Sequence, residues 1–467
     1  MSLLSLGALV VLSTLTQAVP VAPAVPVAPE IPVAAPRDAA VESQVDAIAA
    51  EFLQQPGAVG LSIGVARRGE LLLAKGYGLA EAEFSVPADG ETLFRIGSVT
   101  KQFTAAAILL LVEQGKLSLD DTLEKLVPEF PTAGHVVTLR QLLNHTSGIP
   151  SYTALGKTWM AKWPLELSDA ELLALVDGVP FDFEPGQGWN YSNTGYYLLG
   201  MIVARAGGTS YGEHVRSALF QPLGLQRSRY DSHRELIPKR AQGYSLADGQ
   251  LVNDIHLGMS QPGGAGGLLS SGGELVRWQM ALTAGKVVSP ASFAAMTTPT
   301  VLPDGTTRGY GFGLGIDEFF GRPRIQHGGG IFGFNSMLIW FPADDFHVAV
   351  ISNGEPLDSG EVADAIAMTV LGIEKPIVKD DPTTPELRAR LAGNYRLADV
   401  SMDARIFEQD GRLLCQASGQ GAFGLLWQGG DEFRADFDGD VRVVFDADAG
   451  GFTLHQGGGK VHAARVP

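Results

Sequence analysis

Residues 97–115 read GSVTKQFTAAAILLLVEQG, which places a serine and a lysine three positions apart at the start of a long apolar run. The run predicts a helix that ends near Gly115, and the i, i+3 spacing puts Ser98 and Lys101 on one face of it. The macrodipole near a helix N-terminus and partial burial both disfavour a charged lysine, so Lys101 could accept the Ser98 proton as a neutral amine. Taken alone, the pair is more simply a helix-capping serine beside a solvated lysine.

Two later motifs change this balance. Tyr191-Ser192-Asn193 supplies a phenol, which can act as acid or base beside a cation, and a carboxamide that can hold a substrate carbonyl. His327-Gly328-Gly329-Gly330 is expected at the start of a strand, where glycines let a substrate backbone lie along the strand edge and the Gly330 N–H could face an oxyanion. Each has a plainer interpretation, a surface turn and a glycine-rich bulge respectively. The three motifs together predict a nucleophilic site.

The strands of the predicted sheet come from both ends of this region. Helical periodicity predicts a helix over 41–54, and the segments 59–67 and 71–78 flank Arg68-Gly69 as a hairpin. Three further strands are predicted between 309 and 353, over 309–316, through 337–341 and over 346–351, followed by a helix over 359–371. We therefore expect an α/β (α+β) fold with one antiparallel sheet of five strands, covered by helices and carrying a helical insertion.

The sequence pattern of the chain changes from about residue 385. Short runs of alternating apolar and polar residues are separated by turn signals such as Asp410-Gly411 and Gly429-Gly430. Such spacing is typical of a small antiparallel β-barrel or sandwich, predicted over 386–467 after a linker at 376–385. This domain could bind a ligand of its own or narrow access to the nucleophilic site, and the second is the simpler role.

The first 39 residues are expected to lie outside the folded part. An apolar block over 3–15 and the small-residue site Thr16-Gln17-Ala18 predict a signal peptide over 1–18, with a retained apolar tail as the alternative. Six prolines over 19–39 predict an extended spacer. The chain should then be periplasmic or secreted, with no stable membrane span once the leader is removed.

Composition excludes several classes of function. With 34 basic and 51 acidic residues the formal charge is 34 − 51 = −17, which argues against a nucleic-acid partner. A single cysteine, Cys415, rules out an internal disulfide, a thiolate zinc site and an iron–sulfur cluster within one chain. The nine histidines contain no H-E-x-x-H pair, and no G-x-S-x-G elbow is present. No metal or cofactor is expected, and the oligomeric state is left open.

The three motifs resemble those of the serine β-lactamase and penicillin-binding-protein superfamily, in the branch of class C β-lactamases, D-alanyl-D-alanine carboxypeptidases and D-aminopeptidases. Accessory stretches also match, namely Leu142-Leu143-Asn144-His145-Thr146-Ser147-Gly148 and Phe183-Glu184-Pro185-Gly186. The resemblance covers 40–375, with Tyr-x-Asn as the second motif and His327 in place of the lysine of K-T-G. The tail from Leu391-Ala392-Gly393-Asn394-Tyr395-Arg396 is similar to the lipocalin-like barrel appended to some members.

This resemblance implies a role for each residue of the motifs. Ser98 is the nucleophile, and Lys101 shares proton transfer with Tyr191. The substrate, a small molecule or peptide, would contact Asn193, His327 and the glycines of the third motif, Gly328, Gly329 and Gly330. The N–H groups of Ser98 and Gly330 would form the oxyanion hole.

The substrate is less well defined by the sequence. A histidine at position 327 is mostly neutral at pH 7 and binds anions less firmly than a lysine. In the resembling families H-x-G accompanies D-peptidases and D-aminopeptidases, so D-amino-acid peptides or short acyl esters rank above β-lactams. A β-lactamase and a non-catalytic, penicillin-binding-like sensor or scaffold are the alternatives. Tyr152, Trp159 and Trp163 could form a substrate wall or merely pack, and His145 is expected to be a structural hydrogen-bonding residue.

Overall fold

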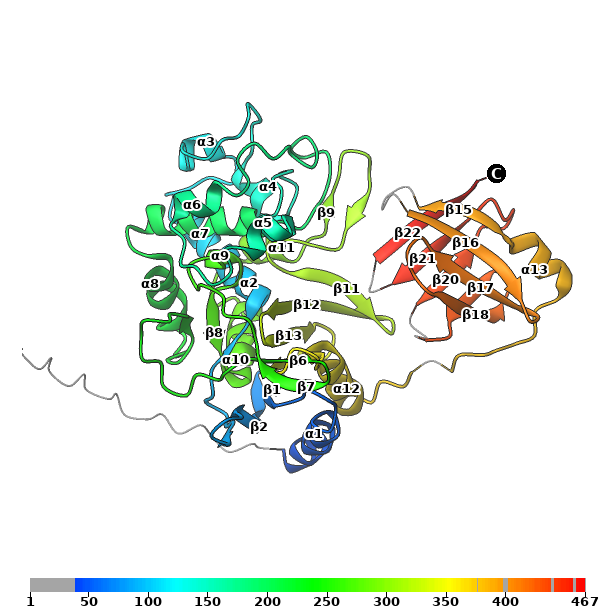
Figure 1. The fold of residues 1–467 in the computed structure, drawn as a ribbon, viewed down its shortest axis with the longest axis horizontal. Coiled ribbons are helices and arrows are strands. Elements are labelled where there is room, and N and C mark those ends of the chain that lie inside the picture. Colours follow the sequence, from blue (N-terminus) through cyan, green and yellow to red (C-terminus); the bar gives the residue numbers. More distant parts are fainter. Residues whose placement is uncertain (1–37, 376, 398–401, 438–440, 457–458, 467) are drawn as a thin grey trace, which may run out of the picture. The chain divides into compact units, whose positions relative to one another are not determined.

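The computed structural model describes residues 38–375, 377–397, 402–437, 441–456 and 459–466. It has an α/β domain with an antiparallel sheet, followed by a closed β-barrel (Figure 1). The predicted signal peptide and nearly all of the proline-rich spacer lie outside the described residues.

The main sheet has seven strands in the order β11-β12-β13-β14-β1-β2-β3. Its centre joins the two ends of the domain, because β1 (Gly60–Arg67) pairs antiparallel with both β2 (Glu70–Glu81) and β14 (Phe346–Ser352). The β1–β2 turn uses Arg68 and Gly69 at φ of +51° and +76°, the backbone conformation of a two-residue hairpin turn. The predicted hairpin and the closure of the sheet by both chain ends are therefore confirmed. The short strand β3 (Val86–Pro87) completes one edge.

The late part of the sheet holds four strands where the sequence predicted three. They are β11 (Gly315–Phe319), β12 (Arg322–Ile331), β13 (Phe334–Phe341) and β14. A tight turn with Phe320 and Gly321 at φ of +46° and +79° separates β11 from β12, and one with Gly333 at +77° separates β12 from β13. These turns were missed, so the expected strand over 309–316 is wrong in position. The expected single strand through 337–341 is in fact the hairpin β12–β13, and His327 lies within β12 instead of at a strand start.

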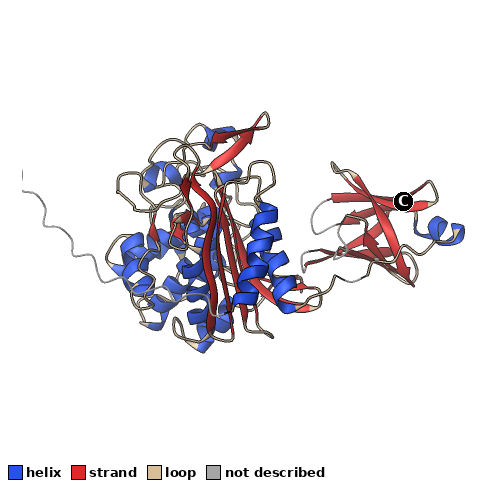
Figure 2. Cartoon of the chain, turned by 90° about the horizontal axis from the view of Figure 1, so that it is seen from below, coloured by secondary structure: helices blue, strands red, loops and turns tan. Residues whose placement is uncertain are grey.

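Helices cover both faces of the sheet (Figure 2). On one face lie α1 (Ala39–Phe52) and α12 (Ser359–Leu371), which pack in one apolar cluster with alternate residues of β1 such as Leu61 and Ile63. On the other face α10 (Gly272–Thr283) lies directly on β1, because a Cβ atom at Gly64 would be 2.1 Å from the Gly272 carbonyl oxygen. The predicted helices over 41–54 and 359–371 are confirmed.

The middle of the chain is largely helical, as predicted, and it packs in the larger of the two apolar clusters of this domain. It begins with the short strand β4 (Phe94–Arg95), the 3₁₀ turn η1 (Gly97–Val99) and α2 (Thr100–Glu113). Its remaining elements are α3 (Leu123–Leu126), α4 (Leu139–Leu143), η2 (Tyr152–Ala154), α5 (Lys157–Met160), α6 (Asp169–Leu173), α7 (Asn193–Gly207), α8 (Tyr211–Val215), the π-helical turn η3 (Arg216–Phe220), β5 (Arg229–Tyr230), β6 (Tyr244–Ala247), β7 (Gln250–Asn253), α9 (Gly263–Gly266), β8 (Leu268–Ser270), α11 (Pro290–Met296), β9 (Thr300–Val301) and β10 (Thr307–Arg308).

The C-terminal domain is a closed antiparallel barrel of eight strands. The strands are β15 (Gly393–Leu397), β16 (Met402–Gln409), β17 (Arg412–Ala417), β18 (Ala422–Gly429), β19 (Glu432–Ala435), β20 (Arg442–Phe445), β21 (Gly451–Gln456) and β22 (Gly459–Val466). Helix α13 (Pro385–Leu391) is tied to the barrel where the Tyr395 hydroxyl donates to the Leu391 carbonyl oxygen at 2.7 Å. Burial raises the pKa of the Cys415 thiol to about 12, so this cysteine is an inert packing residue.

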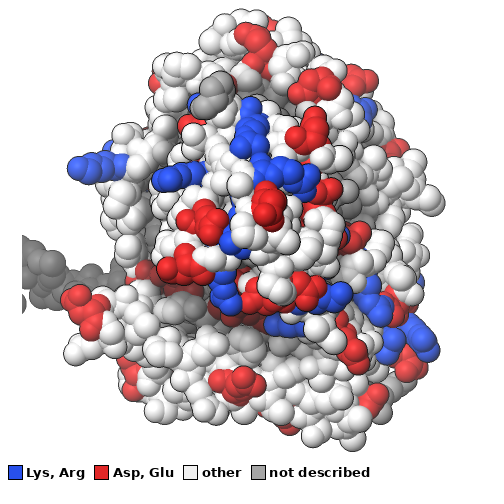
Figure 3. Space-filling model, turned by 90° about the vertical axis from the view of Figure 1, so that its right-hand side faces the viewer, with Lys and Arg blue, Asp and Glu red and all other residues white. Residues whose placement is uncertain are grey.

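Charged side chains of both signs share the molecular surface. Figure 3 shows Lys and Arg interspersed with Asp and Glu on one face of the molecule. Among the described helices, none combines the length and the apolar character that crossing a membrane requires.

Candidate active site

Ser98 lies in the turn η1, immediately before α2. The turn packs against β12, because a Cβ atom at Gly97 would lie 2.9 Å from the Gly330 nitrogen. It is anchored from the preceding strand β4, where Arg95 forms a 2.8 Å ion pair with the fully buried carboxylate of Asp231. Burial tends to raise the pKa of Asp231, but the guanidinium groups of Arg95 and Arg240 outweigh this and hold the pKa below its usual value. The nucleophile turn therefore sits between a strand edge and a buried charge network.

Lys101 is fully buried on the first turn of α2. Its Nζ atom lies 2.8 Å from Asn193 Oδ1, 2.8 Å from the Ala265 carbonyl oxygen and 3.1 Å from Ser98 Oγ. Burial lowers the pKa of Lys101 well below its usual value. A neutral amine has two N–H groups and one lone pair, and the amide and carbonyl oxygens can only accept. In the neutral form they take both N–H groups, so the lone pair is left to accept from the Ser98 hydroxyl.

Tyr191 also forms a hydrogen bond with Ser98. The Lys101 Nζ atom lies 4.7 Å from the centre of the Tyr191 ring. Burial raises the pKa of Tyr191, and a hydrogen bond with Ser98 acts in the opposite direction without reversing the rise. The phenol therefore keeps its proton at neutral pH and shares Ser98 Oγ with Lys101. The structure brings the three residues of the predicted proton-transfer set into one hydrogen-bonded group.

Asn193 begins α7 behind the capping residue Ser192, whose hydroxyl accepts from the Gly195 N–H at 3.2 Å. Both ends of its carboxamide are bonded, Oδ1 to Lys101 and Nδ2 to Thr153 Oγ1 at 3.0 Å. Thr153 comes from η2, more than 50 residues along the chain from Ser98, and no sequence pattern singled it out. In this arrangement Asn193 orients Lys101, in addition to the substrate contact expected from the motif.

His327 is buried and its two ring nitrogens are both engaged. Nδ1 lies 2.6 Å from the Gly328 carbonyl oxygen and therefore donates, while Nε2 lies 2.9 Å from the Tyr310 hydroxyl and accepts from it. Burial and the nearby Lys101 lower the pKa of His327 to about 3, against a smaller opposite effect of the Gly328 hydrogen bond. The imidazole is thus neutral, as the reference pKa suggested. Tyr310 is a site residue that sequence reasoning missed.

The glycines of β12 allow the strand to meet the nucleophile turn. A Cβ atom at Gly329 would lie 2.2 Å from the Ile96 carbonyl oxygen and 2.9 Å from the Ser98 nitrogen, so this position accepts no side chain. Pairing with β11 ends at Gln326, which leaves residues 327–331 as an edge on that side. At Gly330 a Cβ atom would meet nothing within 4 Å. The expected edge for an extended substrate is therefore present next to Ser98.

His145 fills the interior behind Tyr191. Its Nδ1 accepts from the Ser192 N–H at 3.1 Å, so Nε2 carries the proton, and this nitrogen is buried without a hydrogen-bond partner among the described residues. Its ring lies 4.4 Å from that of Tyr191 and 4.8 Å from that of Tyr310, measured between centroids. Burial lowers the pKa of His145 well below its usual value. The expected structural role of His145 agrees with these contacts.

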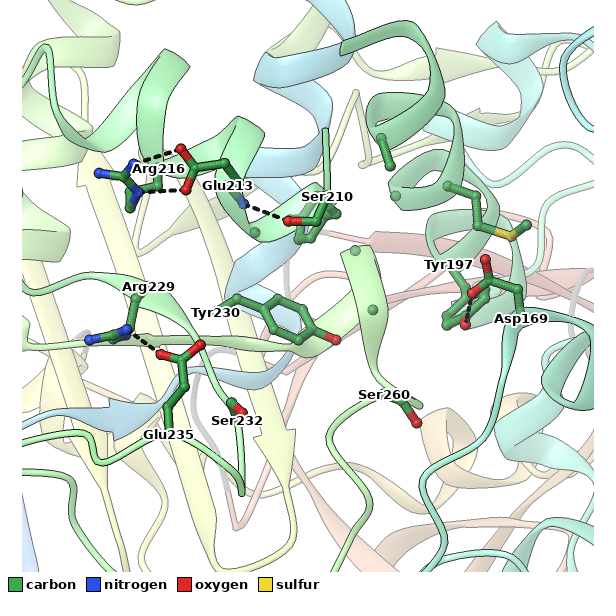
Figure 4. Close-up of a pocket in the computed structure, with 17 residues that line it drawn as sticks. Asp169, Tyr197, Ser210, Glu213, Arg216, Arg229, Tyr230, Ser232, Glu235 and Ser260 are labelled. Atoms are coloured by element: carbon green, nitrogen blue, oxygen red, sulfur yellow. Dashed lines mark hydrogen bonds and ion pairs between the residues drawn. The ribbon is translucent and has the colours of Figure 1, made fainter. Parts of the chain in front are cut away.

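A cavity of about 350 Å³ opens beside Ser98. Its lining includes Tyr152, Trp159 and Trp163, which is the substrate-wall alternative of the sequence analysis, together with Phe332 from the β12–β13 turn. A second cavity of about 560 Å³ lies on the other side of α9, around Tyr230 and the ion pairs Arg216–Glu213 and Arg229–Glu235 (Figure 4). Its described lining contains none of the predicted catalytic residues, so we assign the active site to the first cavity.

The chain is similar to known proteins over most of its length. The model of the family described as beta-lactamase matches residues 45–372. Penicillin-binding protein 4* of Bacillus subtilis strain 168 is 30% identical, over 76% of this chain and 83% of its own length. The D-aminopeptidase of Gluconobacter oxydans strain 621H is 28% identical, over 79% of this chain and 68% of its own. The crystal structure of D-amino acid amidase from Ochrobactrum anthropi SV3 superimposes with a TM-score of 0.63 at 26% identity, covering 71% of this chain and 99% of that one.

Proposed function

Because this chain belongs to the beta-lactamase family of serine hydrolases, we propose that it hydrolyses small amides or esters through an acyl-enzyme on Ser98. The observation that carries the proposal is the environment of Lys101. Two acceptors occupy the N–H groups of its neutral amine, and the remaining lone pair faces the Ser98 hydroxyl at 3.1 Å. A lysine held in this way is a base that needs no metal or thiol.

The proposed reaction proceeds in two balanced steps. Lys101 takes the Ser98 proton while Ser98 Oγ forms a bond to the substrate carbonyl carbon, and the N–H groups of Ser98 and Gly330 face the developing oxyanion. The bond to the leaving amine or alcohol then breaks, and the proton reaches that leaving group through Tyr191. Water then attacks the resulting ester and gives up a proton along the same route in reverse, from Tyr191 and Lys101 back to Ser98 Oγ. This step releases the acid and restores Ser98.

The favoured substrates are D-amino-acid amides and peptides, with short acyl esters as simpler substrates of the same chemistry. Two relatives of this family bear the names D-aminopeptidase and D-amino acid amidase, and one amidase structure is a complex with L-phenylalanine amide. The neutral His327, with its pKa near 3, supports the same choice, since it offers no cation for the carboxylate of a β-lactam or a peptide C-terminus.

The test is a substrate panel run on wild-type protein and Ser98→Ala. We expect hydrolysis of p-nitrophenyl acetate and of D-aminoacyl p-nitroanilides, weak turnover of nitrocefin, and a loss of about 10³-fold or more in the variant. Mass spectrometry after treatment with a fluorophosphonate should locate one adduct on Ser98. A Ser98→Ala variant as fast as wild type would remove the nucleophile from the proposal. Adduct formation without turnover of any substrate would favour the non-catalytic sensor.

We also propose that the protein is exported. The support is the apolar block over residues 3–15 followed by Thr16-Gln17-Ala18, the pattern of a leader with a small-residue cleavage site. N-terminal sequencing of the mature protein should begin at Val19, whereas a chain that still begins at Met1 would contradict export by this leader.

A further inference from the structure

The cavity beside Ser98 is almost free of charge. Of the described residues that line it, Glu355 is the single one among the Asp, Glu, Lys and Arg types. Lys101 approaches the cavity only through Ser98 and Asn193, and its N–H groups are already taken. An anionic group of a substrate would find no positive partner among these lining residues, whereas a cationic group would find a carboxylate.

The cavity extends along β12 in one direction. Its described lining contains Gly330, Ile331 and Phe332 but none of residues 327–329, so it runs from Ser98 away from His327. Gly330, Asn335 and Ser352 face one another in register across β12, β13 and β14, and Glu355 follows three residues after Ser352. Two strand spacings, about 10 Å, separate Gly330 from Ser352, and Glu355 lines the same cavity as Ser98 and Gly330.

Glu355 is held in place by its backbone. Its N–H donates to the Tyr244 carbonyl oxygen at 2.9 Å, and the Tyr244 N–H donates to the Asn353 carbonyl oxygen at 2.9 Å. Partial burial raises the pKa of Glu355, and the neighbouring Asp254 raises it further. A cation bound beside the two carboxylates would relieve the repulsion between them. The backbone of Glu355 is therefore fixed, and its exposed carboxylate lies in surroundings that favour a cation next to it.

The lining of the cavity also contains a group of aromatic side chains, Trp159, Trp163 and Phe332. The ring centroids of Trp163 and Phe332 are 4.7 Å apart, and those of Trp159 and Phe332 are 6.2 Å apart. Aromatic faces accept both an apolar side chain and a cation within about 6 Å. A cavity lined by both a carboxylate and aromatic rings suits a ligand that carries an ammonium group and an apolar side chain together.

We propose that Glu355 binds the protonated amino group at the N-terminal end of the acyl donor, so that the enzyme selects aminoacyl amides and peptides with a free amine over N-acylated ones. This inference rests on the proposed hydrolase function, because it concerns the acyl group that Ser98 would receive. It makes Glu355 a specificity-determining residue of the same site. The aromatic side chains of the cavity would take the apolar side chain of that residue.

The experiment compares free and N-acetylated forms of two substrates, D-phenylalanine p-nitroanilide and D-alanyl-D-phenylalanine p-nitroanilide. At pH 7 the free α-amine is largely protonated, since its pKa is about 7.7 to 8.0. The measured quantity is the ratio of kcat/KM for the free form to that for the acetylated form. We expect wild-type protein to prefer the free amine in at least one pair, and Glu355→Gln to lower that ratio about tenfold. Glu374→Gln, which makes the same change at an exposed position outside the cavity lining, should leave the ratio unchanged.

Each outcome separates this inference from the function on which it rests. Hydrolysis of p-nitrophenyl acetate combined with equal ratios in wild type and Glu355→Gln overturns the role of Glu355 and leaves the Ser98 acyl-enzyme in place. Hydrolysis of the acetate with no turnover of any anilide has the same consequence. Failure of wild-type protein to hydrolyse any substrate or to react with a fluorophosphonate overturns both.

Discussion

Two regions of the active site differ in charge: the inner wall, formed by the buried residues around Lys101, and the mouth of the cavity, where Glu355 is exposed. The inner wall holds ionisable side chains that are all deeply buried, and burial shifts each pKa towards the uncharged form: Lys101, His145, Tyr191, Tyr310 and His327. At the mouth, Glu355 is exposed and lies near a second carboxylate. Lys101, uncharged at rest, can accept a proton from Ser98, while the exposed Glu355 is proposed to select a substrate by charge.

This difference follows from solvation. A charge transferred from water into a protein interior costs several kcal/mol even after relaxation, so buried groups that titrate become neutral instead. A neutral lysine is a far better base towards a serine hydroxyl than an ammonium group, which has no lone pair. An exposed carboxylate keeps most of its hydration and can exchange that water for a substrate cation. The same principle thus assigns chemistry to the inner wall and recognition to the mouth.

Lys101→Met should produce the largest effect, because it removes the base and keeps the shape of the side chain. We expect kcat/KM for p-nitrophenyl acetate to fall by about 10³ to 10⁴-fold. In wild-type protein the activity depends on neutral Lys101, whose pKa is lowered by burial. Activity is therefore full above that pKa and is lost as the pH falls through it. This loss, the acid limb of the pH–rate profile, should be absent from any residual activity of the variant.

The control for this change is Lys116→Met, a loss of one positive charge at an exposed position just beyond α2. It should leave both the rate and the pH profile unchanged. If Lys101→Met retained a tenth of the wild-type rate with the same acid limb, Lys101 would not be the base, and the neutral inner wall would be only a feature of packing.

The contrast between the two regions also separates what the sequence could predict from what it could not. Ser98, Lys101, Tyr191 and Asn193 were found because each lies in a short motif whose spacing has a chemical meaning. The hairpin and the helix over 359–371 were found because their periodicity and turn residues are local. Glycine at 329 was singled out with its motif, although the reason it must be glycine, contact with the turn before Ser98, is visible only in the fold.

Residues that reach the site through tertiary contacts were missed. Tyr310 lies in a stretch expected to be a strand, and only the register of β12 brings its hydroxyl to His327. Thr153 lies in the short helix η2 and Glu355 in a turn far along the chain, and nothing in their immediate neighbours distinguishes them from surface residues. The division of β12 from β13 was missed for another reason: a glycine run within a strand looks like a break, while the true turn at Phe332-Gly333 carries a bulky residue. Tyr310, Thr153 and Glu355 were missed because their place in the site depends on tertiary contacts and not on local composition.

Tyr191→Phe should have a smaller effect that depends on the leaving group. The change removes only the hydroxyl, which shares Ser98 with Lys101 and is proposed to carry the proton to the departing amine. An amine must be protonated to leave, whereas p-nitrophenolate leaves without a proton. We therefore expect kcat/KM to fall about 10²-fold for D-aminoacyl amides and clearly less for p-nitrophenyl esters.

The control for this variant is Tyr395→Phe, which removes a buried phenol hydroxyl from the barrel domain. It should leave the ratio of kcat/KM for D-aminoacyl amides to kcat/KM for p-nitrophenyl esters unchanged. Equal losses for amides and esters in Tyr191→Phe would assign Tyr191 to the positioning of Ser98 and not to proton delivery.

His327→Gln should have the smallest effect, and the pH dependence makes it informative. The pKa of His327 is lowered to about 3, chiefly by burial, so the ring is protonated only below that pH and is uncharged throughout the working range. Glutamine retains a neutral donor and acceptor at this position but loses the geometry that links Tyr310 to the strand. We expect kcat/KM to fall less than about tenfold, as for the loss of one neutral hydrogen bond. The acid limb of the wild-type profile should not move, because it belongs to Lys101. A shift of that limb by a full unit would mean that His327 carries charge in the wild-type enzyme, and the inner wall would then bind anions as a lysine in its place would.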